Sequence, residues 1–262
     1  MERLRWQGDF PAEGGAIRLD GYRPTTRPVP RITRPIDAVV MEMSGVLYDD
    51  TFWPRWLWQR LAKLGLAASF ETFWSVCEQE YLPDVYAGRR ELWDALCTYF
   101  VEMGLSRGRI EEVRIAAEAR RLQWQSGLRP FPGVAATLTK LAARPLRLVV
   151  LTNSCCRGEE LRERLATLGL DEFFSDVIAS RDLGLALPAG EAWCELGRRL
   201  NVSLASVAFV SREGATLRGA ATAGVVAIGM HQARATSGVA SLDQFADLAE
   251  VFRAAAAPAK AA

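Results

Sequence analysis

Apolar segments that end in turns of small polar residues are the feature that most constrains the fold of this chain. Residues 146–151 end at Thr152-Asn153-Ser154, and residues 207–210 end at Ser211. Segments with helical spacing of apolar residues follow these turns, and the alternation continues toward the C-terminus. Strands that alternate with helices pair in parallel through right-handed crossovers. The sequence therefore predicts an α/β fold with a doubly wound parallel sheet.

The expected elements can be placed from the apolar pattern and from the glycines that interrupt it. Strands are predicted at residues 38–43, 146–151, 177–178, 207–210 and 225–228, the last of these being the final strand. Helices are predicted between them at residues 133–140, 159–168, 190–200 and 217–223. Gly169 and Gly224 end two of these helices.

A long helical insertion separates the first predicted strand from the others. Leu57, Leu61 and Leu64 recur at helical spacing, and the same spacing recurs through residues 73–117, with glycines between the segments. Residues 51–128 are therefore predicted to form a bundle of about four helices. Most of its tryptophans are expected in the bundle core, with one lining a pocket or an interface.

The bulk properties predict an ordinary soluble protein. The net charge is +1, which gives no global attraction to nucleic acid or to an anionic membrane. No apolar run reaches the ~20 residues of a membrane span, and no secretory pattern follows Met1. The five cysteines are odd in number and lack zinc-site spacing, so we expect a reduced, cytoplasmic protein. The single histidine, His231, is expected in a surface loop.

The two ends of the chain differ from the rest in composition. Residues 1–35 are rich in Pro, Gly and Arg, show no periodicity and are predicted to form an extension. A partner-binding arm is the alternative for this segment, and it leaves open a homodimer or a scaffold role. Residues 254–262 are rich in alanine and are predicted to be a flexible tail.

Residues 39–49 carry the most specific motif. The apolar run leads into Glu42, then Ser44 and Gly45. This layout resembles the first motif of the haloacid dehalogenase superfamily, in which Asp, any residue, Asp and Gly stand in this order. Further segments resemble later family motifs in the same order: residues 128–134, 148–154, 168–174, 183–188 and 209–224.

The resemblance implies a Rossmann-like core, residues 36–50 and 129–253, with an inserted all-helical (C1-type) cap, residues 51–128. It also implies site roles, because the family transfers phosphoryl groups through its first aspartate. Glu42 then stands at the nucleophile, Ser44 at the acid/base and Thr152 at the phosphate-holding hydroxyl. Glu42 and Glu213 are the candidate ligands of a magnesium ion. No cofactor is expected unless the chain is catalytically active, in which case Mg²⁺ is.

This sequence departs from the family pattern at several polar positions. Glutamate moves the carboxylate by about 1 Å, and a misplacement of that size can cost about 100-fold in rate. A serine at position 44 cannot exchange protons near neutral pH, which costs about 10²–10⁴-fold. Leu187 stands where the family has lysine, and Arg212 stands where it has aspartate. We expect a salt bridge between Arg212 and Glu42 in place of the metal.

The remaining candidates are ligand-binding residues. No lysine lies between Lys140 and Lys260, so Arg181 and then Arg212 are the nearest substitutes for the missing cation. Arg89 lies in a cap segment with tyrosines that suits an anionic organic ligand. The full set of predicted ligand-binding residues is Gly45, Asn153, Arg181, Arg212 and Arg89.

Three hypotheses follow. The first is a family member that has lost phosphoryl transfer, a pseudo-phosphatase that binds a small anionic ligand or a protein. The second is an active magnesium-dependent hydrolase of a small anionic substrate with Glu42 as nucleophile. The third is an oligomeric scaffold. Neither nucleic acid nor a membrane is expected as a partner.

Overall fold

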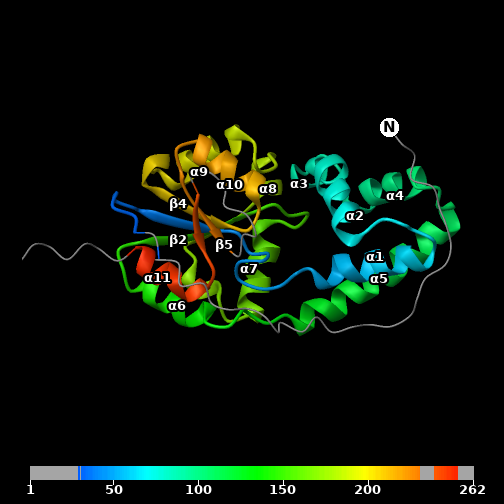
Figure 1. The fold of residues 1–262 in the computed structure, drawn as a ribbon, viewed down its shortest axis with the longest axis horizontal. Helices are drawn as coiled ribbons and strands as arrows, with labels where there is room; N and C mark the ends of the chain where they lie inside the picture. Colours follow the sequence, from blue (N-terminus) through cyan, green and yellow to red (C-terminus); the bar gives the residue numbers. More distant parts are fainter. Residues whose placement is uncertain (1–28, 30, 231–238, 253–262) are drawn as a thin grey trace, which may run out of the picture.

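A parallel sheet flanked by helices and a separate helical unit make up the chain (Figure 1). The computed structural model describes residues 29, 31–230 and 239–252. The predicted arm, the alanine-rich tail and His231 lie largely or wholly outside these residues. None of the helices in the described stretches is long and apolar enough to cross a membrane.

The sheet has six strands in the order β3-β2-β1-β4-β5-β6, and every pair is parallel. The strands are β1 Ala38–Met41, β2 Arg147–Thr152, β3 Asp176–Ala179, β4 Val207–Ser211, β5 Val226–Met230 and β6 Ala240–Leu242. The chain reverses its direction of winding at β1, which lies between β2 and β4. Loops that follow these three strands therefore meet at one edge of the sheet.

The doubly wound parallel sheet is confirmed, with one correction. The sequence prediction ended the sheet at residues 225–228, whereas β6 follows β5 and pairs with it. This prediction was wrong because β6 has only three residues and is partly exposed, so it carries no apolar run. Short edge strands of this kind leave little signal in a sequence.

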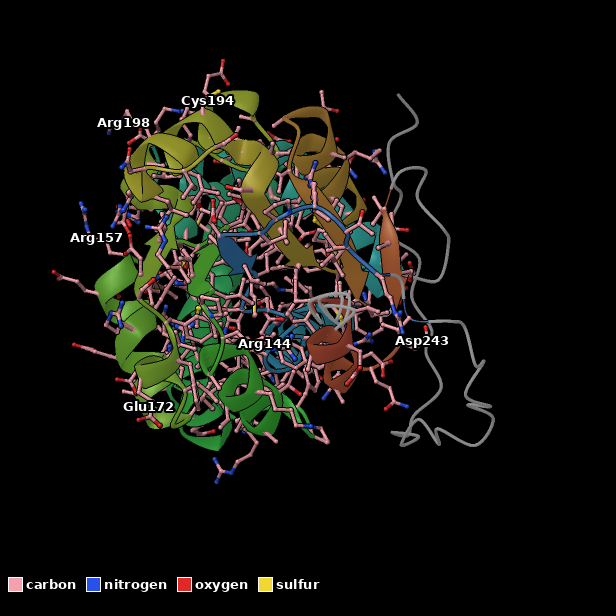
Figure 2. The ribbon with its side chains drawn as sticks, turned by 90° about the vertical axis from the view of Figure 1, so that its left-hand side faces the viewer. Arg144, Arg157, Glu172, Cys194, Arg198 and Asp243 are labelled. Carbon is pink, nitrogen blue, oxygen red and sulfur yellow. The ribbon has the colours of Figure 1, made fainter. Side chains whose placement is uncertain are left out.

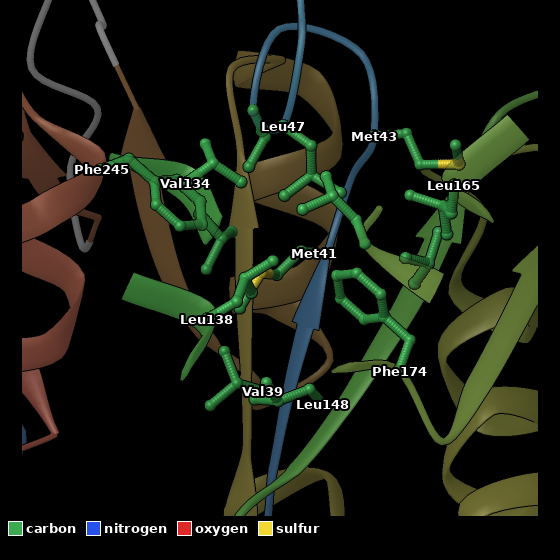
Figure 3. Packing of buried hydrophobic residues seen from close by; sticks show 14 of the residues in the cluster. Val39, Met41, Met43, Leu47, Val134, Leu138, Leu148, Leu165, Phe174 and Phe245 are labelled. Atoms are coloured by element: carbon green, nitrogen blue, oxygen red, sulfur yellow. The ribbon is translucent and has the colours of Figure 1, made fainter. Parts of the chain in front are cut away.

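Helices cover both faces of the sheet, and alternate residues of β1 divide between two cores. Val39 and Met41 pack in one cluster with residues of α6 Val134–Ala142, α7 Gly158–Thr167 and α11 Leu248–Val251 (Figure 3). Ala38 and Val40 pack in the other, against α9 Gly190–Leu200 and α10 Gly214–Thr222. Both faces of β1 are completely buried, which explains why its sequence is continuously apolar.

The remaining helices of the core are short. One α-helix, α8 Ser180–Leu183, follows β3 directly. Single 3₁₀ turns lie at Asp171–Phe173, Leu204–Ser206 and Phe245–Asp247. Charged side chains such as Arg157, Glu172 and Arg198 point outward from the core in Figure 2. Cys194 lies at the surface on α9 in the same view.

The helical unit lies to one side of the sheet (Figure 1). Its α-helices are α1 Phe52–Lys63, α2 Phe70–Val76, α3 Pro83–Tyr86, α4 Leu92–Glu102 and α5 Arg107–Gly127. A π-helical stretch, Cys77–Tyr81, joins α2 to the segment before α3. The predicted repeats supply its core, because Leu57, Leu61 and Phe100 are completely buried in one cluster. Trp53 on α1 donates its indole N–H to the Ala117 carbonyl of α5 at 2.9 Å.

Candidate functional site

A cavity of about 1020 Å³ lies between the strand ends and the helical unit, and we call it the cleft. Core loops and cap helices both contribute to its lining. Seven of the predicted site residues line it: Glu42, Ser44, Gly45, Thr152, Asn153, Arg212 and Glu213. The fold thus brings together residues from three loops that lie far apart in the sequence.

Glu42 lies directly after β1 and is 5% exposed. Its backbone N–H donates to the Val210 carbonyl at 3.0 Å, which continues the pairing of β1 with β4. The Ser211 hydroxyl donates a hydrogen bond to the Glu42 carboxyl group. Burial raises the pKa of Glu42 to about 8 against the effect of this hydrogen bond, and the charge of Glu213 raises it further. At neutral pH Glu42 is therefore mostly a neutral acid.

Ser44 has a partner that the sequence analysis missed. Its hydroxyl donates to the Asp50 carboxylate, six residues further along the same loop. Burial is the largest effect on Asp50 and raises its pKa to about 6, and the neighbouring Asp49 raises it as well. The positive charges of Arg212 and Arg164 act in the opposite direction. A titratable carboxylate therefore stands beside the serine that occupies the acid/base position.

Arg212 lies across the first loop. Gly45 has a φ of +67°, and a Cβ atom at this position would stand 2.3 Å from the Arg212 Cδ atom. Only glycine combines this backbone conformation with so close an approach. The hydrogen bond described above for Glu42 comes from Ser211, so the predicted salt bridge between Arg212 and Glu42 stays a prediction.

The second and third loops are joined through Asn153. Its side-chain oxygen accepts the Leu187 N–H at 2.8 Å, and its amide nitrogen donates to the Leu187 carbonyl at 3.1 Å. Leu187 itself is buried at the place where the resemblance leads one to look for lysine. Thr152 is buried at the end of β2 and lines the cleft. Asn153 therefore has a structural function in addition to its predicted role in ligand binding.

The cap supplies site residues that sequence reasoning did not find. Glu78 lies in the π-helical stretch and lines the cleft with Trp74 and Tyr86. Burial raises the pKa of Glu78 to about 7, and the charge of Glu213 adds to this effect. Glu78 follows apolar core residues at helical spacing, so its sequence context indicates only a helix surface. Its place in the cleft results from the docking of the cap against the core.

Two predicted arginines lie away from the cleft lining. Arg89 is an exposed residue, 2.8 Å from Asp84 in an ion pair. Arg181 forms an ion pair of 2.7 Å with Glu91 of the cap and donates to the Cys155 carbonyl at 2.8 Å. Neither arginine is among the described residues that line the cleft. Their predicted roles in ligand binding stay predictions.

A second, smaller cavity of about 150 Å³ adjoins the cleft, and we call it the inner cavity. Both cavities are lined by Ser44, Asp50, Thr152, Asn153, Trp74 and Tyr86. Beyond this common wall the inner cavity is lined by two arginines, Arg121 and Arg164, and by further aromatic side chains. It also meets Cys155 and Cys156 at the start of the segment before α7.

The polar groups of the cleft do not fit a magnesium site. Mg²⁺ requires near-octahedral oxygen ligands at about 2.0–2.1 Å. Among residues 29, 31–230 and 239–252, no three His, Cys, Asp or Glu side chains are grouped so that they could hold a metal ion. Arg212 also brings a positive charge to the fourth loop.

Comparison with known proteins identifies a family that this chain matches. The model of the family described as haloacid dehalogenase-like hydrolase matches residues 36–224. A glyceraldehyde 3-phosphate phosphatase from Methanopyrus kandleri is 31% identical over 102 residues, 38% of this chain and 43% of that protein. This match therefore spans less than half the length of the curated relative.

Solved structures share the fold over most of the chain. L-2-haloacid dehalogenase from Xanthobacter autotrophicus, with chloropropionic acid covalently bound, is 25% identical with a TM-score of 0.52, covering 77% of this chain and 79% of that one. A 2-haloacid dehalogenase from Pseudomonas syringae is 21% identical with a TM-score of 0.55, covering 82% and 97%. A putative β-phosphoglucomutase from Thermotoga maritima is 18% identical with a TM-score of 0.61, covering 82% and 98%.

Proposed function

The chain belongs to the haloacid dehalogenase-like hydrolases, and we propose that it is a member that binds a small organic anion and has lost phosphoryl transfer. The lining of the cleft carries this proposal: Leu187 is buried where the family has lysine, and Arg212 stands on the fourth loop where the family has aspartate. A nucleophilic carboxylate must be ionised before it attacks phosphorus. At neutral pH, most molecules would hold Glu42 as a neutral acid buried beside Ser211.

The surroundings of Glu42 support the same proposal. Asp50, Glu78 and Glu213 each raise the pKa of Glu42, so the charged groups that act on it are acidic. A phosphate ester with two negative charges would be repelled by this set, because like charges at short range disfavour one another. Members of the family generally use magnesium when they are active. The cleft residues described above do not form a site for it.

The second hypothesis, a magnesium-dependent hydrolase with Glu42 as nucleophile, also has an observation in its favour. The match to the phosphatase from Methanopyrus kandleri is the relevant similarity. Thr152 and Asn153 also remain at the cleft end of β2, as a phosphate-holding loop would require. Under this alternative, a bound metal would have to remove the proton of Glu42 and draw the carboxylates together. The oligomeric scaffold rests on residues 1–35, of which only a few lie in the described part of the chain.

Phosphatase activity separates the first two hypotheses. We expect the protein incubated with Mg²⁺ and p-nitrophenyl phosphate to release no more p-nitrophenol than its Glu42→Ala variant. Glu112→Ala changes an exposed glutamate on α5 and serves as the matched control. Turnover that Glu42→Ala abolishes and Glu112→Ala preserves would overturn the proposal and establish the hydrolase.

A further inference from the structure

The inner cavity has a size, a lining and a charge that together specify a ligand. We propose that it binds a single aromatic ring bearing one carboxylate, with the ring among its aromatic side chains and the carboxylate on Arg164. This inference rests on the proposed function, since it names the class of anion that the site holds. It assigns the ligand to the inner cavity rather than to the part of the cleft beside Glu42.

The volume and the lining specify the ring. Apolar cavities of ~150 Å³ accommodate benzene, and the inner cavity has about this volume. Five aromatic side chains line it: Tyr48, Trp53, Trp74, Tyr86 and Trp124. Met43, Leu82, Leu92 and Leu161 add an apolar surface between them. Aromatic rings favour offset or edge-to-face contact with one another, which a planar ligand satisfies better than a puckered one.

The charge of Arg164 specifies the anion. This half-buried residue of α7 donates to the Tyr48 hydroxyl at 3.5 Å and to the Cys156 sulfur at 3.8 Å. Its guanidinium carbon lies 5.8 Å from the centre of the Trp124 ring. Within the described part of the chain, no carboxylate lies at ion-pair distance from Arg164. Its two hydrogen bonds are long, so a bound carboxylate would offset more of the cost of withdrawing this cation from water.

The geometry of the two groups also matches. Guanidinium binds a carboxylate through two parallel hydrogen bonds, so the planar anion is held in one orientation. Arg121 lines the same cavity and adds a second positive charge. Asp50 lies on the wall common to both cavities, where its charge opposes a second negative charge on the ligand. The cavity therefore suits a monoanion such as benzoate better than a phosphate dianion.

Isothermal titration calorimetry with benzoate tests the proposal. We expect one benzoate per chain, bound at least about tenfold more tightly than benzamide, which has the same shape without the charge. Cyclohexanecarboxylate, which keeps the charge but not the planar ring, is expected to bind more weakly than benzoate. Failure of benzoate to bind, or equal affinity for benzoate and benzamide, would overturn the inference.

Substitution of Arg164 locates the carboxylate. Arg164→Met is expected to weaken benzoate binding about tenfold and to leave benzamide binding unchanged. Arg198→Met removes an exposed arginine of α9, paired with Glu195, and is the matched control. Arg164→Lys keeps the positive charge but not the paired N–H donors of the guanidinium, so it should bind benzoate with intermediate affinity. If Arg164→Met does not fold, Arg164→Lys tests whether Arg164 binds the carboxylate. Benzoate affinity that is the same in wild type and in the folded Arg164 variants would contradict the assignment.

Protection from alkylation locates the ring independently. Cys156 lines the inner cavity, whereas Cys194 lies exposed on α9. Benzoate is expected to slow the labelling of Cys156 by iodoacetamide and to leave the labelling of Cys194 unchanged; equal labelling of Cys156 with and without benzoate would place the ligand elsewhere. The two proposals fail separately. Phosphatase turnover that depends on Glu42 contradicts the proposed function, whereas absence of benzoate binding together with absence of turnover contradicts only the ligand.

Discussion

The cleft and the inner cavity have a wall in common but differ in the balance of their charged residues. Glu42, Asp50, Glu78 and Glu213 line the cleft, and burial raises the pKa of the first three. Arg55 and Arg212 also line the cleft. The inner cavity has Arg121 and Arg164 among aromatic rings and, of the four acids, only Asp50. This difference is the basis of our proposal that the anion binds in the inner cavity and not beside Glu42. A ligand class is therefore better inferred from the inner cavity than from the strand ends.

The acidic residues of the cleft predict the largest effect, which is on the pH dependence of the free energy of unfolding. In the unfolded chain Glu42 ionises near its usual value of 4.5, whereas the folded protein holds its proton up to about pH 8. Folding then requires uptake of a proton, so the free energy of unfolding falls as pH rises through this window, by roughly 1.4 kcal/mol per pH unit. Glu42→Gln removes this dependence. Its stability advantage over wild type should therefore grow by roughly 4 kcal/mol between pH 5 and pH 8.

Urea denaturation at pH 5, 6, 7 and 8 measures this difference. Glu112→Gln, at the exposed position on α5, should follow the wild-type curve at every pH. A constant stability difference between Glu42→Gln and wild type across the series would mean that Glu42 is ionised in the folded protein. The contrast between an acid-holding cleft and a cationic cavity would then be lost.

Asp50, on the wall between the two regions, predicts a smaller effect over a lower range of pH. Burial raises its pKa from 3.8 to about 6, so the wild type loses stability as pH rises from about 4 to 6. Asp50→Asn, whose amide oxygen still accepts from Ser44, should gain roughly 2 kcal/mol over wild type across this range. The same urea series, begun at pH 4, tests this. A gain that appears only above pH 7 would show that Asp50 does not titrate as the structure indicates.

Cys156 probes the positive charge beside the inner cavity, and the expected change in its reactivity is the smallest of these effects. The Cys155 thiol donates to it and Arg164 adds a positive charge, which together lower the pKa of Cys156 below its usual value. Arg164→Met should move the midpoint of its reaction with iodoacetamide to higher pH by less than about one unit. Labelling followed by peptide mass spectrometry measures this midpoint, with Arg198→Met as control. An unchanged midpoint in Arg164→Met would show that Arg164 does not act on the thiol.

The parts of the molecule that could be predicted are those that depend on the local pattern of apolar residues. Residues 148–151 lie in a strand because they are apolar on both sides of the chain, and the end of that strand places Thr152 and Asn153 at the cleft. The spacing of Leu57 and Leu61 likewise specifies a helix face that other cap helices cover. For such residues, burial and position follow from the pattern of the chain itself.

The residues that were missed depend on contacts between distant segments. Asp50 reaches Ser44 only because the first loop turns back on itself, where Tyr48 also pairs with Pro130. Arg164 falls on the helix stripe of Leu161, Leu165 and Leu168, so its spacing predicts contact with the protein interior but not with which part of it. Its place beside the inner cavity arises from the packing of α7 against the cap. No local pattern encodes such proximity.

The hydrogen bonds between Asn153 and Leu187 have a consequence for substitutions at position 187. Both engage the main chain of Leu187, so they are indifferent to the side chain at this position. Leucine or lysine at position 187 would therefore leave the second and third loops joined. The main-chain frame of these loops does not depend on the charge that this residue carries.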